Sequence, residues 1–267
     1  MNAGGLHVIS DRRLTGEENL VSALVAAAEG GATAIHLREG DLPARRQYEL
    51  ARALRDRLPA GTLLLVNERL DIAMAAGADG VQLPARGLTV EDARAVAPGL
   101  LVGRSVHALD EFAEAPDFFL LGTIFASRSH PGRPPGGPGL IRRARAVSGR
   151  PIVAIGGVTA DNAATVRLAG ADGVAVISAV LGADDPRAAA AAIVAALGGE
   201  TIRVRLNGRD RELPAGLSVL GLLESLGVDY RIVAVELSGD IVDRARFAET
   251  VIPDGATVEI VRMIGGG

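Results

Sequence analysis

The chain contains no cysteine, and all 28 of its basic residues are arginines, so lysine is absent as well. Without thiols the protein has no disulfides, no thiolate nucleophile and no cysteine-type zinc site. Without lysine it cannot form a Schiff base with a carbonyl substrate, which excludes that class of aldolase chemistry.

Long apolar runs are also missing. The start, MNAGGLHVISDRRL, lacks the apolar core of a signal peptide, and the alanine run at Ala188–Ala196 is too short to cross a bilayer. That run is better explained as a helix with Asp185 as N-cap, Pro186 at its first position and Gly198 just past its end. The net charge of −4 gives no basic footprint for nucleic acid or an anionic membrane. We expect a cytoplasmic protein that binds neither.

A short cassette recurs in the first part of the chain: a helical stretch, then Gly-Ala, then a β-branched run. It reads GGATAIHL from Gly30, GADGVQL from Gly77 and GADGVAV from Gly170. The glycine suits a helix C-cap, and the apolar run suits a strand buried on both faces. Helical patterns separate the runs, which favours a (β/α)₈ TIM barrel over a doubly wound sheet. The eight expected strands are Leu6–Ser10, Ala34–Leu37, Leu63–Val66, Val81–Leu83, Leu101–Ser105, Phe118–Leu121, Ile152–Ile155 and Gly173–Ile177.

The pattern changes near Gly198. From Thr201 the sequence alternates, with Asn207-Gly208 as a two-residue hairpin turn, and Ser218 then caps a short amphipathic helix. Two further strand patterns follow, and the last runs into a glycine tail. This order predicts a small α+β domain of the β-grasp (ubiquitin-like) type. We therefore expect a barrel at 1–197 and a β-grasp domain at 200–267.

Both parts resemble proteins of one pathway. The stretches HVISD, AIHLRE, VNERLDIA, GADGVQLP, GRSVH, LGTIF, VAIGGVT and GADGVAVIS are similar to the thiamine phosphate synthase / thiazole tautomerase (TenI) superfamily. Residues 201–267 resemble the sulfur carrier ThiS, with LNGRDRELPAG, RIVAVELSGDIV and DGATVEIVRMIGGG. The resemblance implies thiamine biosynthesis, and more specifically its thiazole branch.

In such barrels the catalytic face lies at the carboxyl ends of the strands, and phosphate is commonly held after strands 7 and 8. Here Gly156 and Gly157 let backbone N–H groups approach an oxyanion beside a helix N-terminus. We expect Gly173, Ile177 and Ser178 to complete a phosphate site for thiazole phosphate.

The long loop after the sixth strand has the composition of a lid. By resemblance, its two hydroxyl residues, Ser127 and Ser129, bind thiazole phosphate, and His130 stands where the synthases have a lysine.

Two subfamilies remain to be separated. The synthase joins hydroxymethylpyrimidine pyrophosphate to thiazole phosphate and requires Mg²⁺. Its strand-2 motif, Gln-Leu-Arg-Glu-Lys, is HLREG at His36–Gly40, its Asn-Asp motif is Asn67-Glu68, and its second acid is missing from QLPARG. These departures favour the tautomerase, an isomerase that aromatises carboxythiazole phosphate without a metal or other cofactor. The synthase remains the alternative, and a barrel that only binds thiazole phosphate is a second alternative.

By resemblance, Thr123 occupies the position of the catalytic histidine of the tautomerase subfamily, so other residues are candidates for the acid/base role. Three histidines are substitutes, in the order His130, His107 and His36, the last with an equal claim to be a core residue. Glu39 is a further candidate base, although an ion pair with Arg38 or a surface role is an equal alternative. The expected substrate ligands are Arg38 for a carboxylate, with His36, Asn67, Gln82 and Ser105.

The C-terminal domain is expected to work through its tail. By resemblance, an E1-like adenylyltransferase of the ThiF type activates the carboxylate of Gly267, which becomes a thiocarboxylate, and a ThiG-type thiazole synthase takes the sulfur. Gly266 and Gly267 suit this role because a chain without side chains can enter a narrow channel. The oligomeric state stays open, with a homodimer among the arrangements that the sequence allows.

Overall fold

A computed structural model of the protein describes residues 4–126, 134–199 and 201–262. Its first part is a closed barrel of parallel strands in sequence order, and β8 pairs with β1 to close the ring. The predicted TIM barrel is therefore confirmed, with each expected strand within a residue or so of its place. The strands are β1 (Gly5–Ile9), β2 (Ala34–Leu37), β3 (Leu63–Asn67), β4 (Gly80–Leu83), β5 (Leu101–Val106), β6 (Phe118–Gly122), β7 (Ile152–Ile155) and β8 (Gly173–Val176).

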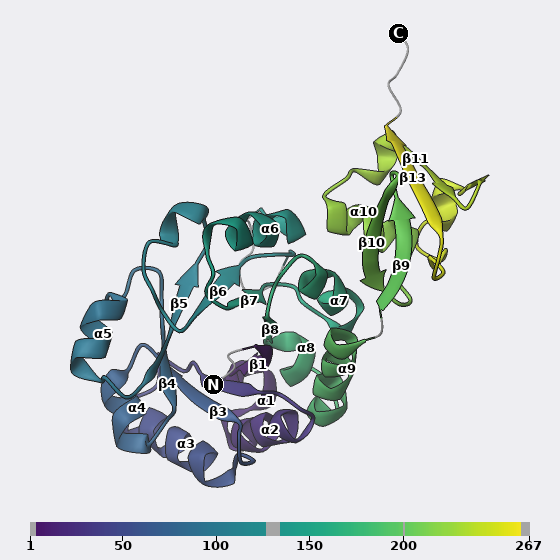
Figure 1. Ribbon diagram of the computed structural model, residues 1–267. Coiled ribbons are helices and arrows are strands. Elements are labelled where there is room, and N and C mark those ends of the chain that lie inside the picture. The colour runs from purple at the N-terminus through teal and green to yellow at the C-terminus, as the bar shows by residue number, and fades with distance from the viewer. Residues whose placement is uncertain (1–3, 127–133, 200, 263–267) are drawn as a thin grey trace.

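Helices surround this ring (Figure 1). They are α1 (Arg12–Thr15), α2 (Glu17–Glu29), α3 (Ala44–Arg57), α4 (Leu70–Ala76), α5 (Val90–Val96), η1 (Leu109–Glu111), α6 (Gly137–Val147), α7 (Ala160–Leu168), α8 (Ser178–Leu181) and α9 (Pro186–Gly198). The outward side chains of the strands, such as Val8, Ile35 and Leu121, pack against the helices. The inward ones, such as Leu65 and Phe118, fill the ring, as apolar residues on both strand faces predict. Among the described residues no helix is long and apolar enough to cross a membrane.

The acidic residue of the recurring cassette has a structural role. Asp79, just before β4, accepts a hydrogen bond from the N–H of Leu64 in β3 at 2.7 Å and one from the Arg55 guanidinium at 2.7 Å. Asp117 before β6 and Asp172 before β8 make the same contacts with the preceding strand and with an arginine on a helix. Each carboxylate thus satisfies a strand-end N–H that the parallel ladder leaves without a partner.

The C-terminal part is a mixed five-stranded sheet in the order β10-β9-β13-β11-β12, consistent with the predicted β-grasp. Asn207 and Gly208 both have positive φ, 44° and 72°, as the predicted hairpin turn requires. Ser218 caps α10 by accepting from the N–H of Gly221. The elements are β9 (Thr201–Leu206), β10 (Arg209–Pro214), α10 (Val219–Leu226), η2 (Tyr230–Ile232), β11 (Val233–Leu237), β12 (Asp240–Ile241), η3 (Arg244–Arg246) and β13 (Thr257–Arg262).

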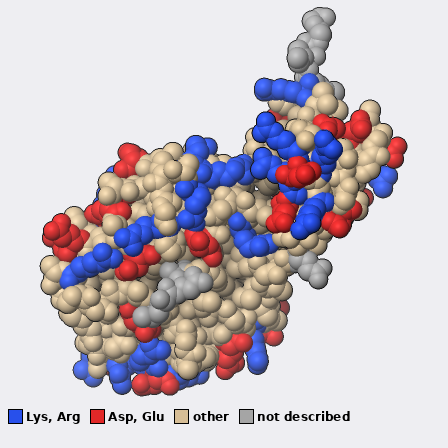
Figure 2. All heavy atoms as spheres, in the orientation of Figure 1, with Lys and Arg blue, Asp and Glu red and all other residues tan. Residues whose placement is uncertain are grey.

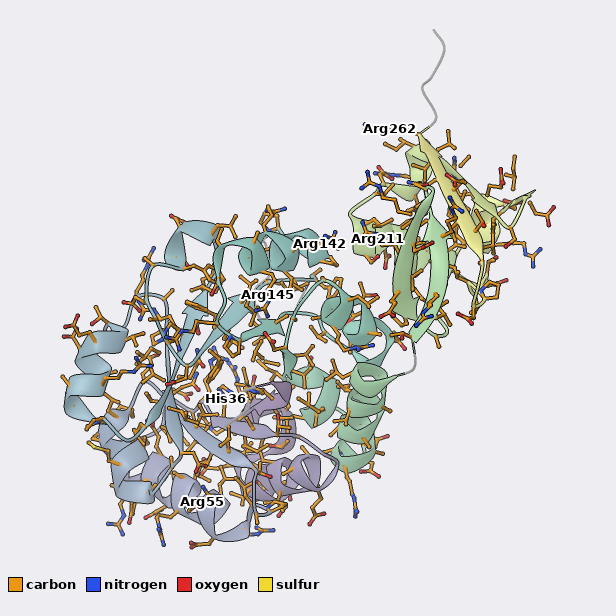
Figure 3. The ribbon with its side chains drawn as sticks, in the orientation of Figure 1. His36, Arg55, Arg142, Arg145, Arg211 and Arg262 are labelled. Atoms are coloured by element: carbon orange, nitrogen blue, oxygen red, sulfur yellow. The ribbon has the colours of Figure 1, made fainter. Side chains whose placement is uncertain are left out.

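The β-grasp part rests against the side of the barrel, where α10 contacts α6 and α7, and β10 contacts α7. Leu168 of α7 packs against the core of the β-grasp part. Strand β13 is parallel to β9, which starts close to the end of α9. Arg262, the last residue of β13, therefore lies at the end that points away from the barrel (Figures 1 and 3).

Candidate functional site

The loop after β7 contains two glycines that let its backbone lie close to neighbouring groups. Gly156 and Gly157 have φ of 103° and 63°, and a Cβ on Gly157 would lie 2.4 Å from the carbonyl oxygen of Ala126. Among the described residues, the N–H groups of Gly157 and Ser178 have no hydrogen-bond acceptor. They lie beside the start of α7 and at the start of α8, so the loops after β7 and β8 offer donors to an anion.

One expected member of this site is elsewhere. Gly173 is the first residue of β8 and pairs with Gly5, so it lies at the opposite end of the barrel. A Cβ on Gly173 would lie 2.5 Å from the carbonyl oxygen of Gly5. Its role is close strand packing, and the prediction that it binds phosphate is wrong. Ile177, by contrast, follows β8 at the mouth and forms the N-cap of α8.

His36 lies inside the ring of strands (Figure 3). Its Nε2 atom is 3.0 Å from Nδ1 of His7, and Phe118 packs edge-on against both rings. Burial and the neighbouring His7 hold the pKa of His36 well below its usual range, so its imidazole is neutral at physiological pH. The Nδ1 atom of His36 is buried and has no hydrogen-bond partner.

Two more inward side chains have a buried polar atom without a hydrogen-bond partner in the described part of the chain. Asn67 at the end of β3 and Gln82 in β4 are opposite each other in the ladder, and the side-chain oxygens of both are buried without a donor. Gln82 donates through Nε2 to Ser105 at 2.9 Å, which brings three expected ligands together. A Cβ on Gly103 would lie 2.2 Å from Gln82 Oε1, so glycine is needed beneath this amide.

Glu39 pairs with Arg12 and not with Arg38, so the ion pair with Arg38 that the sequence offered as one alternative is wrong. Glu39 is only 4% exposed, and its carboxylate accepts from the Ser10 hydroxyl at 2.7 Å and from Nη1 of Arg12 at 2.9 Å. The Arg12 guanidinium also donates to both carboxylate oxygens of Asp41, through Nη1 and Nη2. Ser10, Arg12 and Asp41 were not predicted from the sequence, because the partners are 27 to 29 positions apart and meet only through the pairing of β1 with β2.

The Arg38 side chain can bind an anionic ligand. It follows β2 on the same side as His36, is exposed, and has no ion pair in the part of the chain that the structure describes. A guanidinium in this position at the barrel mouth suits a carboxylate, phosphate or pyrophosphate.

The histidine and threonine on the far side of the mouth are both held in place. His107 Nδ1 is 2.7 Å from the carbonyl oxygen of Gly122, and its backbone N–H donates to Glu111. Thr123 is buried, and its side chain lies against Gly156. The other expected residues of the lid, Ser127, Ser129 and His130, lie outside the described residues, as do Gly266 and Gly267.

The mouth has oxygen ligands suited to one divalent cation bound together with a substrate. Glu68 is exposed directly after β3 and has φ of 63°, beside the unpartnered Asn67 oxygen. Among the described residues no group of three or more metal-ligating side chains occurs. Mg²⁺ needs none, because it commonly binds through one or two protein oxygens plus substrate phosphates and water. The residues present therefore fit a substrate-bound Mg²⁺.

A groove of about 460 Å³ also lies between the barrel and the β-grasp part, lined by Phe125, Asp161, Ser218, Glu224 and small residues. No basic side chain lines it within the described ranges, so it is unsuited to an anion. On the face shown in Figure 2, acidic and basic side chains are interspersed on the barrel.

Comparison with known proteins divides the chain in a similar way. Residues 6–180 match the family described as thiamine monophosphate synthase, and residues 204–267 match the ThiS family. A thiamine-phosphate synthase of Pyrococcus furiosus is 42% identical over 190 residues, which cover 69% of this chain and 90% of that protein. One from Methanoculleus marisnigri is 45% identical over 192 residues, covering 69% and 91%. The solved thiamine phosphate pyrophosphorylase from Pyrococcus furiosus superposes with a TM-score of 0.67 at 38% identity, covering 74% of this chain and 96% of that one.

Proposed function

Because the chain belongs to the thiamine monophosphate synthase family and ends in a ThiS-family domain, we propose that it serves thiamine biosynthesis through two linked activities. The barrel, taken as 1–197, joins hydroxymethylpyrimidine pyrophosphate to thiazole phosphate. The β-grasp part, taken as 200–267, carries sulfur as a thiocarboxylate on Gly267. The names of the relatives favour the synthase, the alternative from the sequence, over the tautomerase.

One structural observation supports the synthase most strongly. His36 Nδ1, Asn67 Oδ1 and Gln82 Oε1 are buried polar atoms without partners, on three adjacent strands. Unsatisfied buried acceptors cost free energy, so such atoms commonly serve a ligand. Thiazole phosphate has no N–H donor. The pyrimidine of the second substrate has an amino group, which donates to the Gln82 oxygen while a ring nitrogen or N–H group meets His36.

The proposed reaction is a substitution at the methylene carbon of the pyrimidine. The thiazole nitrogen forms a bond to that carbon, and the carbon–oxygen bond to pyrophosphate breaks, so the electron pair leaves with pyrophosphate. Arg38 orients the pyrophosphate, and the loops with Gly157 and Ser178 hold the phosphate of the thiazole. Asn67 and Glu68 would hold Mg²⁺ together with the pyrophosphate, and the metal would supply charge neutralisation for the leaving group.

The test is direct. The purified chain is given both substrates with Mg²⁺, and thiamine phosphate is measured. Formation that stops on chelation of the metal supports the proposal, and no formation refutes it. Arg38→Gln should raise the KM for the pyrimidine pyrophosphate about tenfold or more, because a charge-assisted bidentate contact is lost.

The tautomerase is a second candidate because Gly40 replaces the lysine of the synthase motif and no carboxylate follows β4. In this candidate a group at the mouth, His107 or a lid residue, moves the proton. An assay with carboxythiazole phosphate separates the tautomerase from the synthase. Aromatisation is followed by the ultraviolet spectrum with and without the protein. If the protein accelerates neither reaction, the remaining hypothesis is a barrel that only binds thiazole phosphate.

The position of β13 supports a carrier that acts on other proteins. Five residues follow Arg262, and five extended residues span at most about 18 Å. They start from the end of the β-grasp part that points away from the barrel (Figure 1). We propose that the Gly267 carboxylate enters partners of the ThiF and ThiG types. Incubation with the activating enzyme, ATP and a sulfur donor should give the mass gain of oxygen-to-sulfur exchange. No gain with an enzyme active on another carrier refutes the carrier function.

A further inference from the structure

Glu39 is a buried carboxylate at the barrel mouth that accepts three hydrogen bonds from Ser10 and Arg12. One oxygen, Oε1, accepts from the Ser10 hydroxyl and from the backbone N–H of Arg12, and the other accepts from the Arg12 guanidinium. Its side chain is only 3% exposed. The three hydrogen bonds, one of them from the Arg12 guanidinium, hold the Glu39 carboxylate in one orientation.

The same carboxylate is connected to Arg38 through Ser10. The Ser10 hydroxyl gives its only hydrogen to Glu39 at 2.7 Å, so its oxygen is turned toward the backbone N–H of Arg38 and accepts from it at 2.8 Å. The N–H of Ser10 in turn donates to the carbonyl oxygen of His36 at 2.9 Å. Ser10, the first residue after β1, is thus bonded both to Arg38, the first residue after β2, and to His36 within β2.

We infer that Glu39 is a positioning residue for Arg38: by orienting the Ser10 hydroxyl and holding Arg12, it fixes the backbone that presents the Arg38 guanidinium to an oxyanion at the mouth. The inference rests on the proposed function, since the oxyanion is the pyrophosphate of the substrate. It assigns Glu39 a role in affinity for that anion rather than in proton transfer.

The test measures binding of inorganic pyrophosphate with Mg²⁺ to the full chain by calorimetry, so it does not depend on turnover. Glu39→Gln should weaken binding about tenfold, because the amide no longer fixes the hydroxyl and the guanidinium together. Asp41→Asn is the matched control: it removes one negative charge from the same arginine without touching Ser10, and should leave affinity within about twofold of the wild type.

A double-mutant cycle tests whether Glu39 affects pyrophosphate affinity through Arg38. In an Arg38→Gln background, Glu39→Gln should change the affinity by less than about twofold. Equal losses in both backgrounds, or wild-type affinity of the single variant, overturn the positioning role. Ser10→Ala, which keeps the Glu39–Arg12 ion pair, tests the same contact if Glu39→Gln does not fold, and wild-type affinity of Ser10→Ala overturns the role too.

The outcomes also separate this inference from the synthase proposal. Pyrophosphate binding that depends on Glu39 without formation of thiamine phosphate supports the positioning role and refutes the synthase. Thiamine phosphate formation with a Glu39→Gln variant of unchanged KM supports the synthase and overturns the positioning role. A wild-type protein that binds no pyrophosphate overturns the positioning role.

Discussion

The Nδ1 atom of His7 lies 3.0 Å from the Nε2 atom of His36 inside the closed barrel, where neither ring is exposed. Burial and the neighbouring His7 ring lower the pKa of His36, because a charge on this ring would lose its hydration. Phe118 closes the pair on a third side and supplies no counter-charge.

This pair predicts how stability depends on pH. The pKa of His36 is lowered by burial and by His7, so below its ordinary value of 6.5 the unfolded chain takes up a proton that the folded chain refuses. The free energy of unfolding should therefore fall as the pH drops below that value, with a slope of up to about 1.4 kcal/mol per pH unit. Denaturant titrations between about pH 7.5 and 5.5 measure it, and His36→Gln should have a flatter profile. An identical slope in the variant contradicts the account.

Gly103 should not tolerate a side chain. An added methyl group would lie 2.2 Å from Gln82 Oε1 and 2.4 Å from a ring carbon of Phe118. Gly103→Ala should lower the free energy of unfolding by about 1–3 kcal/mol, the usual cost of overpacking a core. Gly99→Ala is the control, since nothing lies within 4 Å of its added methyl group. Equal melting temperatures of the two variants would show that Gln82 moves aside freely.

The cassette aspartates should matter more than exposed carboxylates. Asp79→Ala removes the acceptor for the Leu64 N–H and the partner of Arg55, and should cost about 1–3 kcal/mol of unfolding free energy. Asp56→Ala, at an exposed helix position paired with Arg52, should leave the melting temperature almost unchanged. The account is wrong on this point if thermal melts rank the two variants in the opposite order.

Deletion of Gly267 should separate the two activities. The proposed thiocarboxylate would form at that terminus, whereas β13 ends on the side away from the barrel (Figure 1). The shortened chain should show no oxygen-to-sulfur mass gain but should retain the kcat and KM of the barrel reaction. A lower barrel rate in the shortened chain would show that the tail reaches the mouth.

Local patterns made most of the fold predictable. The apolar runs of β4 and β8 are buried on both sides as expected, and the Asn207-Gly208 turn has the backbone angles that its sequence demands. Contacts between distant residues were harder to predict. The Glu39–Arg12 pair joins the ends of β1 and β2, and several other charges were equally available to each partner in the sequence. The His7–His36 pair could have been predicted from the sequence, because neighbouring parallel strands place both rings inside the barrel.

Formation of thiamine phosphate is the decisive measurement for the proposed synthase. The purified chain, hydroxymethylpyrimidine pyrophosphate and thiazole phosphate are incubated with Mg²⁺, and thiamine phosphate and released pyrophosphate are quantified together. The account predicts equal amounts of both products, loss of turnover on chelation, and a strong decrease in Gln82→Ala, which removes the amide proposed to hold the pyrimidine. Absence of thiamine phosphate from a folded wild-type chain with both substrates and Mg²⁺ would contradict it.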